Sequence, residues 1–167
     1  MKNIAQTIII TLCFTTVAAF SENKSSINAC SINISQHIKN NTASFIGCDL
    51  HCRDMPNIVT YLNKHPEITI VNFKDNQIGR RGGRVLGEAK YLTYLDMRGN
   101  HIGNEGAVAL AKQNNLTTLL ADNNKISADG ITALANSPSL LVLSLKNSGL
   151  THQALTCLLY TSPSPRD

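Results

Sequence analysis

The feature that most constrains this chain is a polar residue that returns every 24 positions. Asn76, Asn100, Asn124 and Ser148 hold this position. Each stands in the same pattern, Leu-x-x-Leu-x-Leu-x-x-Asn-x-Ile-Gly-x-x-Gly-x-x-x-Leu, with other apolar or small residues at some places. A fixed period of this length is typical of stacked copies of one structural unit, because one copy alone cannot bury its apolar side. We therefore expect residues 68–156 to form four copies, the last of them incomplete.

Each position of the unit has a physical role. The Leu-x-Leu alternation predicts a short strand with one face turned inward. The Asn side chain can donate to backbone carbonyls of adjacent turns, and Gly79 and Gly103 stand at a bend where the absence of a Cβ is useful. Residues 106–111 and 130–135 have helical spacing and are rich in Ala and Leu. The predicted unit is strand, turn, short helix and return. Aromatic residues are only 5% of the chain and Trp is absent, so the core must rest on Leu, Ile, Val and Ala.

This pattern resembles the leucine-rich repeat family. The Gly-Ala-x-Ala-Leu-Ala stretch is similar to the GALA-type subclass, related to the ribonuclease-inhibitor-like group and found in effectors of host-associated bacteria. The resemblance covers residues 68–156, and residues 44–67 weakly. It implies an α/β leucine-rich-repeat solenoid, with curved parallel strands on a concave face and short helices on a convex face. GALA effectors carry an F-box ahead of the repeats. Residues 20–67 show no such segment, so a ubiquitin-ligase role is not expected.

Residues 1–19 have the features of a secretory signal peptide. Lys2 precedes an apolar run over residues 4–19, and Val17-Ala18-Ala19 offers small residues for cleavage after Ala19. A membrane anchor is the alternative, but the run is shorter than the roughly 20 residues that a spanning helix needs. We expect a secreted or periplasmic protein without stable membrane insertion after cleavage.

Residues 157–167 break the repeat register with a Ser-Pro tail. Their codons can be written as a string that resembles the transposase mosaic-end adapter of sequencing libraries. We interpret them as translated adapter, which would end the native sequence at Thr156 and truncate the last repeat. The alternative is a natural disordered tail rich in Pro and Ser.

The segment between the signal and the repeats divides in two. Residues 20–43 are polar, rich in Ser and Asn, and predicted to be flexible. Residues 44–67 are interpreted as a degenerate capping repeat, in which Pro56 suits the first turn of a helix. That helix should bury one face, made by Ile58, Val59 and Leu62. We find no match there to the strand and Asn positions, as expected of a terminal unit.

Three cysteines lie between residues 20 and 156: Cys30, Cys48 and Cys52. In an oxidising compartment, Cys30 could pair with either of the other two, and the absence of any bridge remains open. Cys48, His51 and Cys52 are close in sequence, but a zinc site needs about four ligands at a recognisable spacing. We expect no metal site.

The sequence contains no catalytic motif. A Gly-rich phosphate loop, His-Glu-x-x-His and Gly-x-Ser-x-Gly are all absent, so neither an enzyme nor a cofactor is expected. The net charge of +4 is mild. The basic cluster of Arg80, Arg81 and Arg84 is interpreted as a solvated face of one repeat, and nucleic-acid binding is not expected.

The predicted binding face consists of the strand residues beside the inward Leu-x-Leu pair. They recur in three columns, which are Ile70, Tyr94, Thr118 and Val142; Asn72, Asp96, Leu120 and Ser144; and Lys74, Arg98, Asp122 and Lys146. This mixture of aliphatic, aromatic and alternately charged side chains suits a protein surface better than a phosphate backbone. Tyr94 and Arg98 are the strongest candidates, because both types are enriched at binding hot spots. The alternative is that the partner binds elsewhere.

We therefore predict an exported module that binds another protein, with a host protein as one candidate partner. One alternative is the substrate-recruiting region of a longer enzyme or effector whose catalytic domain is missing. A structural envelope protein is the other alternative. Because the last copy lacks a cap, it should expose Leu143, Leu145 and Leu150 and be poorly soluble when expressed alone.

Overall fold

The structure, a computed structural model, describes residues 34–149. Within them a six-stranded sheet runs in the order β1-β2-β3-β4-β5-β6. Strand β1 pairs antiparallel with β2, and β2 to β6 are parallel to one another. The strands are short: β1 (Ile38–Lys39), β2 (Thr42–Ser44), β3 (Ile70–Asn72), β4 (Tyr94–Asp96), β5 (Thr118–Leu120) and β6 (Val142–Ser144).

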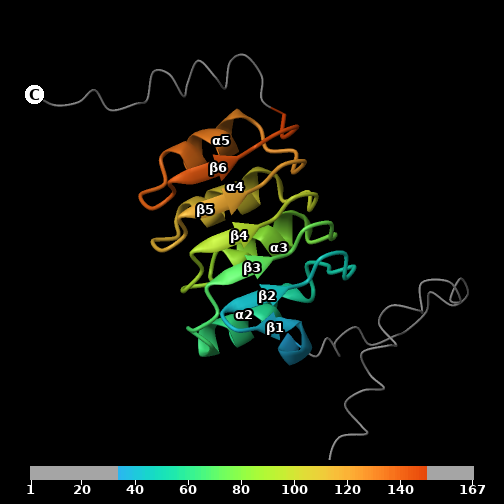
Figure 1. Cartoon of the computed structure of the whole chain (residues 1–167). Coiled ribbons are helices and arrows are strands. Elements are labelled where there is room, and N and C mark those ends of the chain that lie inside the picture. Colours follow the sequence, from blue (N-terminus) through green and yellow to red (C-terminus); the bar gives the residue numbers. More distant parts are fainter. Residues whose placement is uncertain (1–33, 150–167) are drawn as a thin grey trace, which may run out of the picture. The chain divides into compact units, whose positions relative to one another are not determined.

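A helix follows each strand from β2 to β5, and a 3-10 helix, η2 (Ile34–His37), precedes β1. The four α-helices of the described residues are α2 (Met55–Lys64), α3 (Gly79–Leu86), α4 (Gly103–Ala111) and α5 (Ala128–Ala135). They stack behind the strands on one face of the sheet (Figure 1). We call the other face of the sheet the open face. The architecture is α/β with a mostly parallel sheet, which is compatible with a leucine-rich-repeat fold.

The strands pair with an offset of one repeat. Ile70 lies beside Tyr94, Tyr94 beside Thr118, and Thr118 beside Val142. The middle residue of each strand points toward the helices, and Val71, Leu95 and Leu119 are completely buried. The predicted period of 24 residues is therefore the register of the sheet.

The core repeats with the same period. The turn supplies Ile78, Ile102 and Ile126, and the helices supply Leu86, Leu110 and Leu134, all of them at most 1% exposed. Most buried side chains are Leu, Ile, Val and Ala, as the composition predicts. The exceptions are Met55, Met97 and two aromatic residues at the N-terminal end of the described sheet, where the rings of Phe45 and Phe73 stack at 5.2 Å.

The recurring Asn forms the predicted ladder. Asn76 Nδ2 donates to the carbonyls of Phe45 and Phe73, both at 2.7 Å. Asn124 Nδ2 donates to Met97 O at 2.8 Å. The ladder positions are buried, so each side chain satisfies backbone groups that water cannot reach. The glycines predicted at the bend, Gly79 and Gly103, have φ of +65° and +58°, a region that residues with a Cβ adopt rarely.

The N-terminal unit differs from the prediction. Residues 44–67 were expected to lack the strand and Asn positions, and residues 20–43 to be flexible. Instead, β2 joins the sheet, with Ala43 beside Val71. Leu50 N donates to Asn76 Oδ1 at 2.9 Å, as Ile102 N donates to Asn124 Oδ1 at 3.2 Å two units later.

This alignment places Cys48 at the ladder position, 28 residues before Asn76. The ladder position thus lacks an Asn, as expected, but the expectation that this unit lacks the strand is wrong. The reason is a turn over residues 51–54 between Leu50 and α2, which adds four residues to this unit and hides its register from a search at 24. The predicted helix is confirmed, with Pro56 in its first turn and Ile58, Val59 and Leu62 buried.

The C-terminal end of the described sheet is less buried than its centre. Leu143 and Leu145 are only partly buried, whereas Leu119 and Ala121, one unit earlier, are at 0% exposure. Leu150, Cys30, the predicted signal peptide over residues 1–19 and the tail 157–167 lie outside the described residues. No helix within residues 34–149 combines the length and apolar character needed to cross a membrane.

Candidate protein-binding face

The structure brings the three predicted columns together on the open face. The first column begins at Ile70, is partly exposed through Tyr94 and Thr118, and ends at Val142, which is 51% exposed. Neighbouring members lie side by side in the sheet, where strands are about 4.8 Å apart. The columns therefore form one continuous surface, and no helix between residues 34 and 149 covers it (Figure 1).

The second column contains one correction. Asp96 was predicted to face a partner, but its side chain is only 1% exposed. Arg98 lies over it, with Nε at 2.9 Å from Oδ1 and Nη2 at 2.6 Å from Oδ2. Two parallel bonds of this kind match the fork of a guanidinium to the two carboxylate oxygens. Asp96 therefore positions Arg98 and is itself screened from a partner.

Arg98 is consequently held in one orientation. The Arg98 backbone N also donates to Asp96 Oδ1, at 3.2 Å. The hydrogen bond with Asp96, and then its negative charge, raise the pKa of Arg98, so the guanidinium stays charged. Its side chain is 36% exposed. A partner would meet a cation that lies four residues after Tyr94 and two after Asp96. Because Asp96 already orients this side chain, it has little entropy left to lose on binding.

The rest of the third column is also tied to the sheet. Asp122 Oδ1 accepts from Ser144 Oγ at 2.6 Å and from Lys146 N at 2.8 Å. Lys74 Nζ lies 3.5 Å from Asp75 Oδ2. The column therefore carries charges of both signs, and much of that charge is balanced locally. This pattern favours a specific protein surface over a polyanion.

The sequence analysis missed three members of this face. Strand pairing places Thr42 beside Ile70 and Ser44 beside Asn72, so each column continues into the first unit. Ile46, which is 52% exposed, follows two residues later, where later units carry Lys74 and Arg98. The repeat pattern is present in residues 43–50, whose sequence is Ala-Ser-Phe-Ile-Gly-Cys-Asp-Leu. These residues precede their equivalents in the next unit by 28 positions instead of 24.

The other candidate residues do not form a chemical site. Cys48 is partly buried, with Sγ at 3.7 Å from Ile46 O, and Cys52 is exposed. Their predicted partner, Cys30, lies outside the described residues. Between residues 34 and 149 no group of three or more His, Cys, Asp or Glu side chains could hold a metal ion.

Comparison with protein-family models identifies a repeat family in the middle of the chain. A family model described as Leucine Rich repeat matches residues 88–111, which contain all of β4 and α4. No curated protein matches the chain. Proteins with such repeats are generally interaction modules and not enzymes. Together with the strand-turn-helix units in a parallel sheet, the match supports a leucine-rich repeat family for this chain.

Proposed function

We propose that this chain is an exported module that binds a partner protein on the open face of its sheet. The observation that carries the proposal is the alignment of three columns of side chains on a face that no described helix covers. The columns combine aliphatic residues, one tyrosine and charges of both signs, which is the composition of a protein–protein contact. Tyr94 and the orientated Arg98 form its centre.

The finer features of the proposal rest on the sequence. The stacked units form a solenoid of the GALA-type subclass, and the open face is its concave side. Residues 1–19 direct export to the periplasm or beyond the cell. The partner is a protein, with a host protein as one candidate. The chain binds it without a cofactor and without catalysis.

A photo-crosslinker identifies the partner and tests the face. We would replace Tyr94 by p-benzoylphenylalanine in the full chain and irradiate it in culture of the organism that produces it. The expected result is one discrete adduct, which mass spectrometry identifies. The matched control carries the same group at Lys112, an exposed residue at the end of α4, and should give no such adduct. An adduct from Lys112 alone, or the same adduct from both positions, would contradict the proposal.

Affinity for the captured partner provides the quantitative test. Removing a hot-spot aromatic costs about 2 kcal/mol or more, so Tyr94→Ala should weaken binding by about 30-fold. Arg98→Ala is a poorer probe, because it also uncovers the buried carboxylate of Asp96. The double variant Asp96→Asn/Arg98→Gln removes the cation without leaving that charge behind.

A further inference from the structure

Three arginines lie on the exposed side of α3. Arg80, Arg81 and Arg84 are all exposed. Arg84 stands four residues after Arg80 and three after Arg81, the two spacings that make side chains neighbours on a helix. None of the three forms an ion pair with an acid in residues 34–149. The described fold therefore leaves three positive charges unneutralised within two helical turns.

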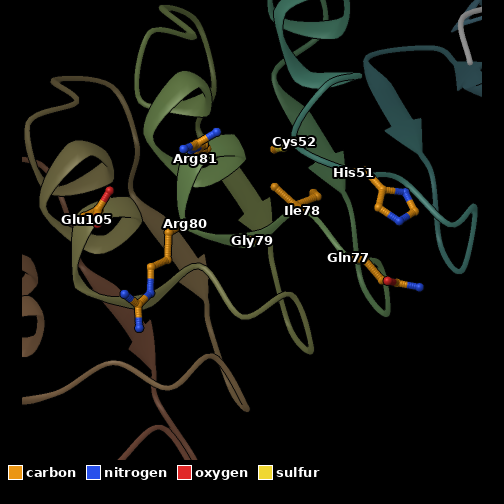
Figure 2. A pocket seen from close by; sticks show the side chains of 8 residues that line it. All are labelled: His51, Cys52, Gln77, Ile78, Gly79, Arg80, Arg81 and Glu105. Atoms are coloured by element: carbon orange, nitrogen blue, oxygen red, sulfur yellow. The ribbon is translucent and has the colours of Figure 1, made fainter.

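The first of these arginines is held in place by the neighbouring helix. A Cβ on Gly103 would lie only 3.1 Å from Arg80 Cγ and 3.2 Å from its Nε, so the Arg80 stem occupies space that this glycine leaves open. Figure 2 shows Arg80 and Arg81 leaving the first turn of α3 in different directions. Both line a depression of about 370 Å³, together with His51, Gln77 and Glu105.

The position of two of these charges opposes local stability. Arg80 and Arg81 lie in the first turn of α3, and that turn contains no acid. The positive end of the helix dipole disfavours cations there and favours carboxylates. The next two helices follow the rule, with Glu105 and Asp129 one repeat and two repeats after Arg81. A local rule broken in α3 and obeyed in the next two helices points to a role at the surface.

The basic footprint is only one unit wide. One repeat after Arg80, Arg81 and Arg84 the same positions hold Asn104, Glu105 and Val108, and two repeats after them they hold Ala128, Asp129 and Thr132. A nucleic acid would need a basic track along several helices and would meet Glu105 and Asp129 instead. A short carboxylate-rich segment matches the footprint, because guanidinium groups bind carboxylates with both charge and geometry.

From these observations we infer that the α3 face of Arg80, Arg81 and Arg84 is a second docking surface, for a short acidic segment of a partner protein. It lies on the helix-covered side of the sheet and uses none of the residues of the open face. The inference is therefore independent of the proposed function, and either can fail without the other.

A matched pair of variants tests it in the full chain. The probe is a short fluorescein-labelled peptide of alternating Glu and Gly, followed by fluorescence anisotropy at low salt. Exposed charge contacts are worth about 0.5 kcal/mol each, so Arg80→Gln/Arg81→Gln/Arg84→Gln should bind about tenfold more weakly. The control Lys90→Gln/Lys112→Gln/Lys125→Gln removes the same charge from exposed sites elsewhere and should bind as the unaltered chain does.

Further measurements distinguish docking on α3 from attraction to the net positive charge and from binding on the open face. Tyr94→Ala should leave peptide binding unchanged, and salt of about 1 M, where the Debye length is about 3 Å, should abolish it. The same peptide with Gln for Glu should not bind. Equal loss in the two triple variants, or no binding by the unaltered chain, overturns the inference. An oligonucleotide that binds α3 as tightly as the peptide would also overturn it. The inference fails as well if the chain forms a dimer that the variant Glu105→Gln/Asp129→Asn dissociates, because the acids bound by α3 would then belong to a second copy.

Discussion

At the scale of single residues, the pair formed by Asp96 and Arg98 combines a stabilising role with the proposed role in recognition. The carboxylate is buried at 1% exposure, whereas the guanidinium remains 36% exposed. Because an ionised carboxylate is costly to bury alone, Arg98 is required by the fold as well as by the proposed face. The proposed face therefore uses an arginine side chain that the fold itself needs to cover Asp96.

Replacement of Arg98 tests the stabilising role. Arg98→Ala leaves Asp96 without its partner in a buried position. The loss of 3–5 kcal/mol typical of a fully buried pair is reduced here by the exposure of the arginine, so we expect about 2 kcal/mol. Urea denaturation measures it, and Asp96→Asn/Arg98→Ala should recover about half. Lys74→Ala, one unit earlier, should cost under about 0.5 kcal/mol, because its ion pair is exposed on both sides. Equal costs for Arg98→Ala and Lys74→Ala would rule out this account.

At the scale of the element, α3 is the helix that departs most from its neighbours. It begins at Gly79 with two arginines and no acid, and ends with Arg84 in its last turn. The helix dipole therefore disfavours the first two charges and favours the third. The three charges that together form the proposed docking surface thus have opposite effects on the helix that carries them.

This opposition gives a prediction with two signs. Arg80→Gln/Arg81→Gln should raise the free energy of unfolding by about 0.5 kcal/mol, because it removes cations from the positive end of the dipole. Arg84→Gln should lower it by a few tenths of a kcal/mol (about 0.3), because it removes a cation from the negative end. Urea denaturation of both variants at low salt provides the measurement. A change of the same sign in both would show that packing, and not the dipole, governs these positions.

At the scale of the whole molecule, burial declines toward β6 within the described residues. Equivalent inward positions are at 0% exposure in β3, β4 and β5 but only partly buried in β6. In a stack of repeats each unit is stabilised chiefly by its immediate neighbours. The cost of one and the same substitution should therefore depend on the unit in which it is made.

The same leucine in two units tests this dependence. Leu95→Ala in the middle of the sheet should cost about 3 kcal/mol, since it opens a cavity among fully buried neighbours. Leu143→Ala occupies the matching position in β6 and should cost about 1 kcal/mol, because its side chain has less apolar surface to lose. Thermal unfolding followed by circular dichroism compares the two directly. If the two variants lose equal stability, Leu143 is as fully packed in solution as Leu95.

The sequence by itself determined the repeating part of this protein. The period of 24 residues predicted the sheet register, because a parallel stack repeats identical contacts between consecutive units. The same period predicted the Asn ladder and the columns of the open face, whose positions follow from strand alternation alone. Helical spacing likewise identified the buried face of α2, since Ile58, Val59 and Leu62 are all within 4% of complete burial.

Only the tertiary structure decided the features that depend on contacts between units. Four extra residues form a turn without disturbing the strands, so the first unit keeps its register in space while losing it in the sequence. Asp96 is buried because the Arg98 side chain folds back over it, and Arg80 is held because Gly103 of the next unit leaves room. Periodicity specifies which face of a strand or helix a residue occupies. Whether its side chain is covered depends on neighbours that no period specifies.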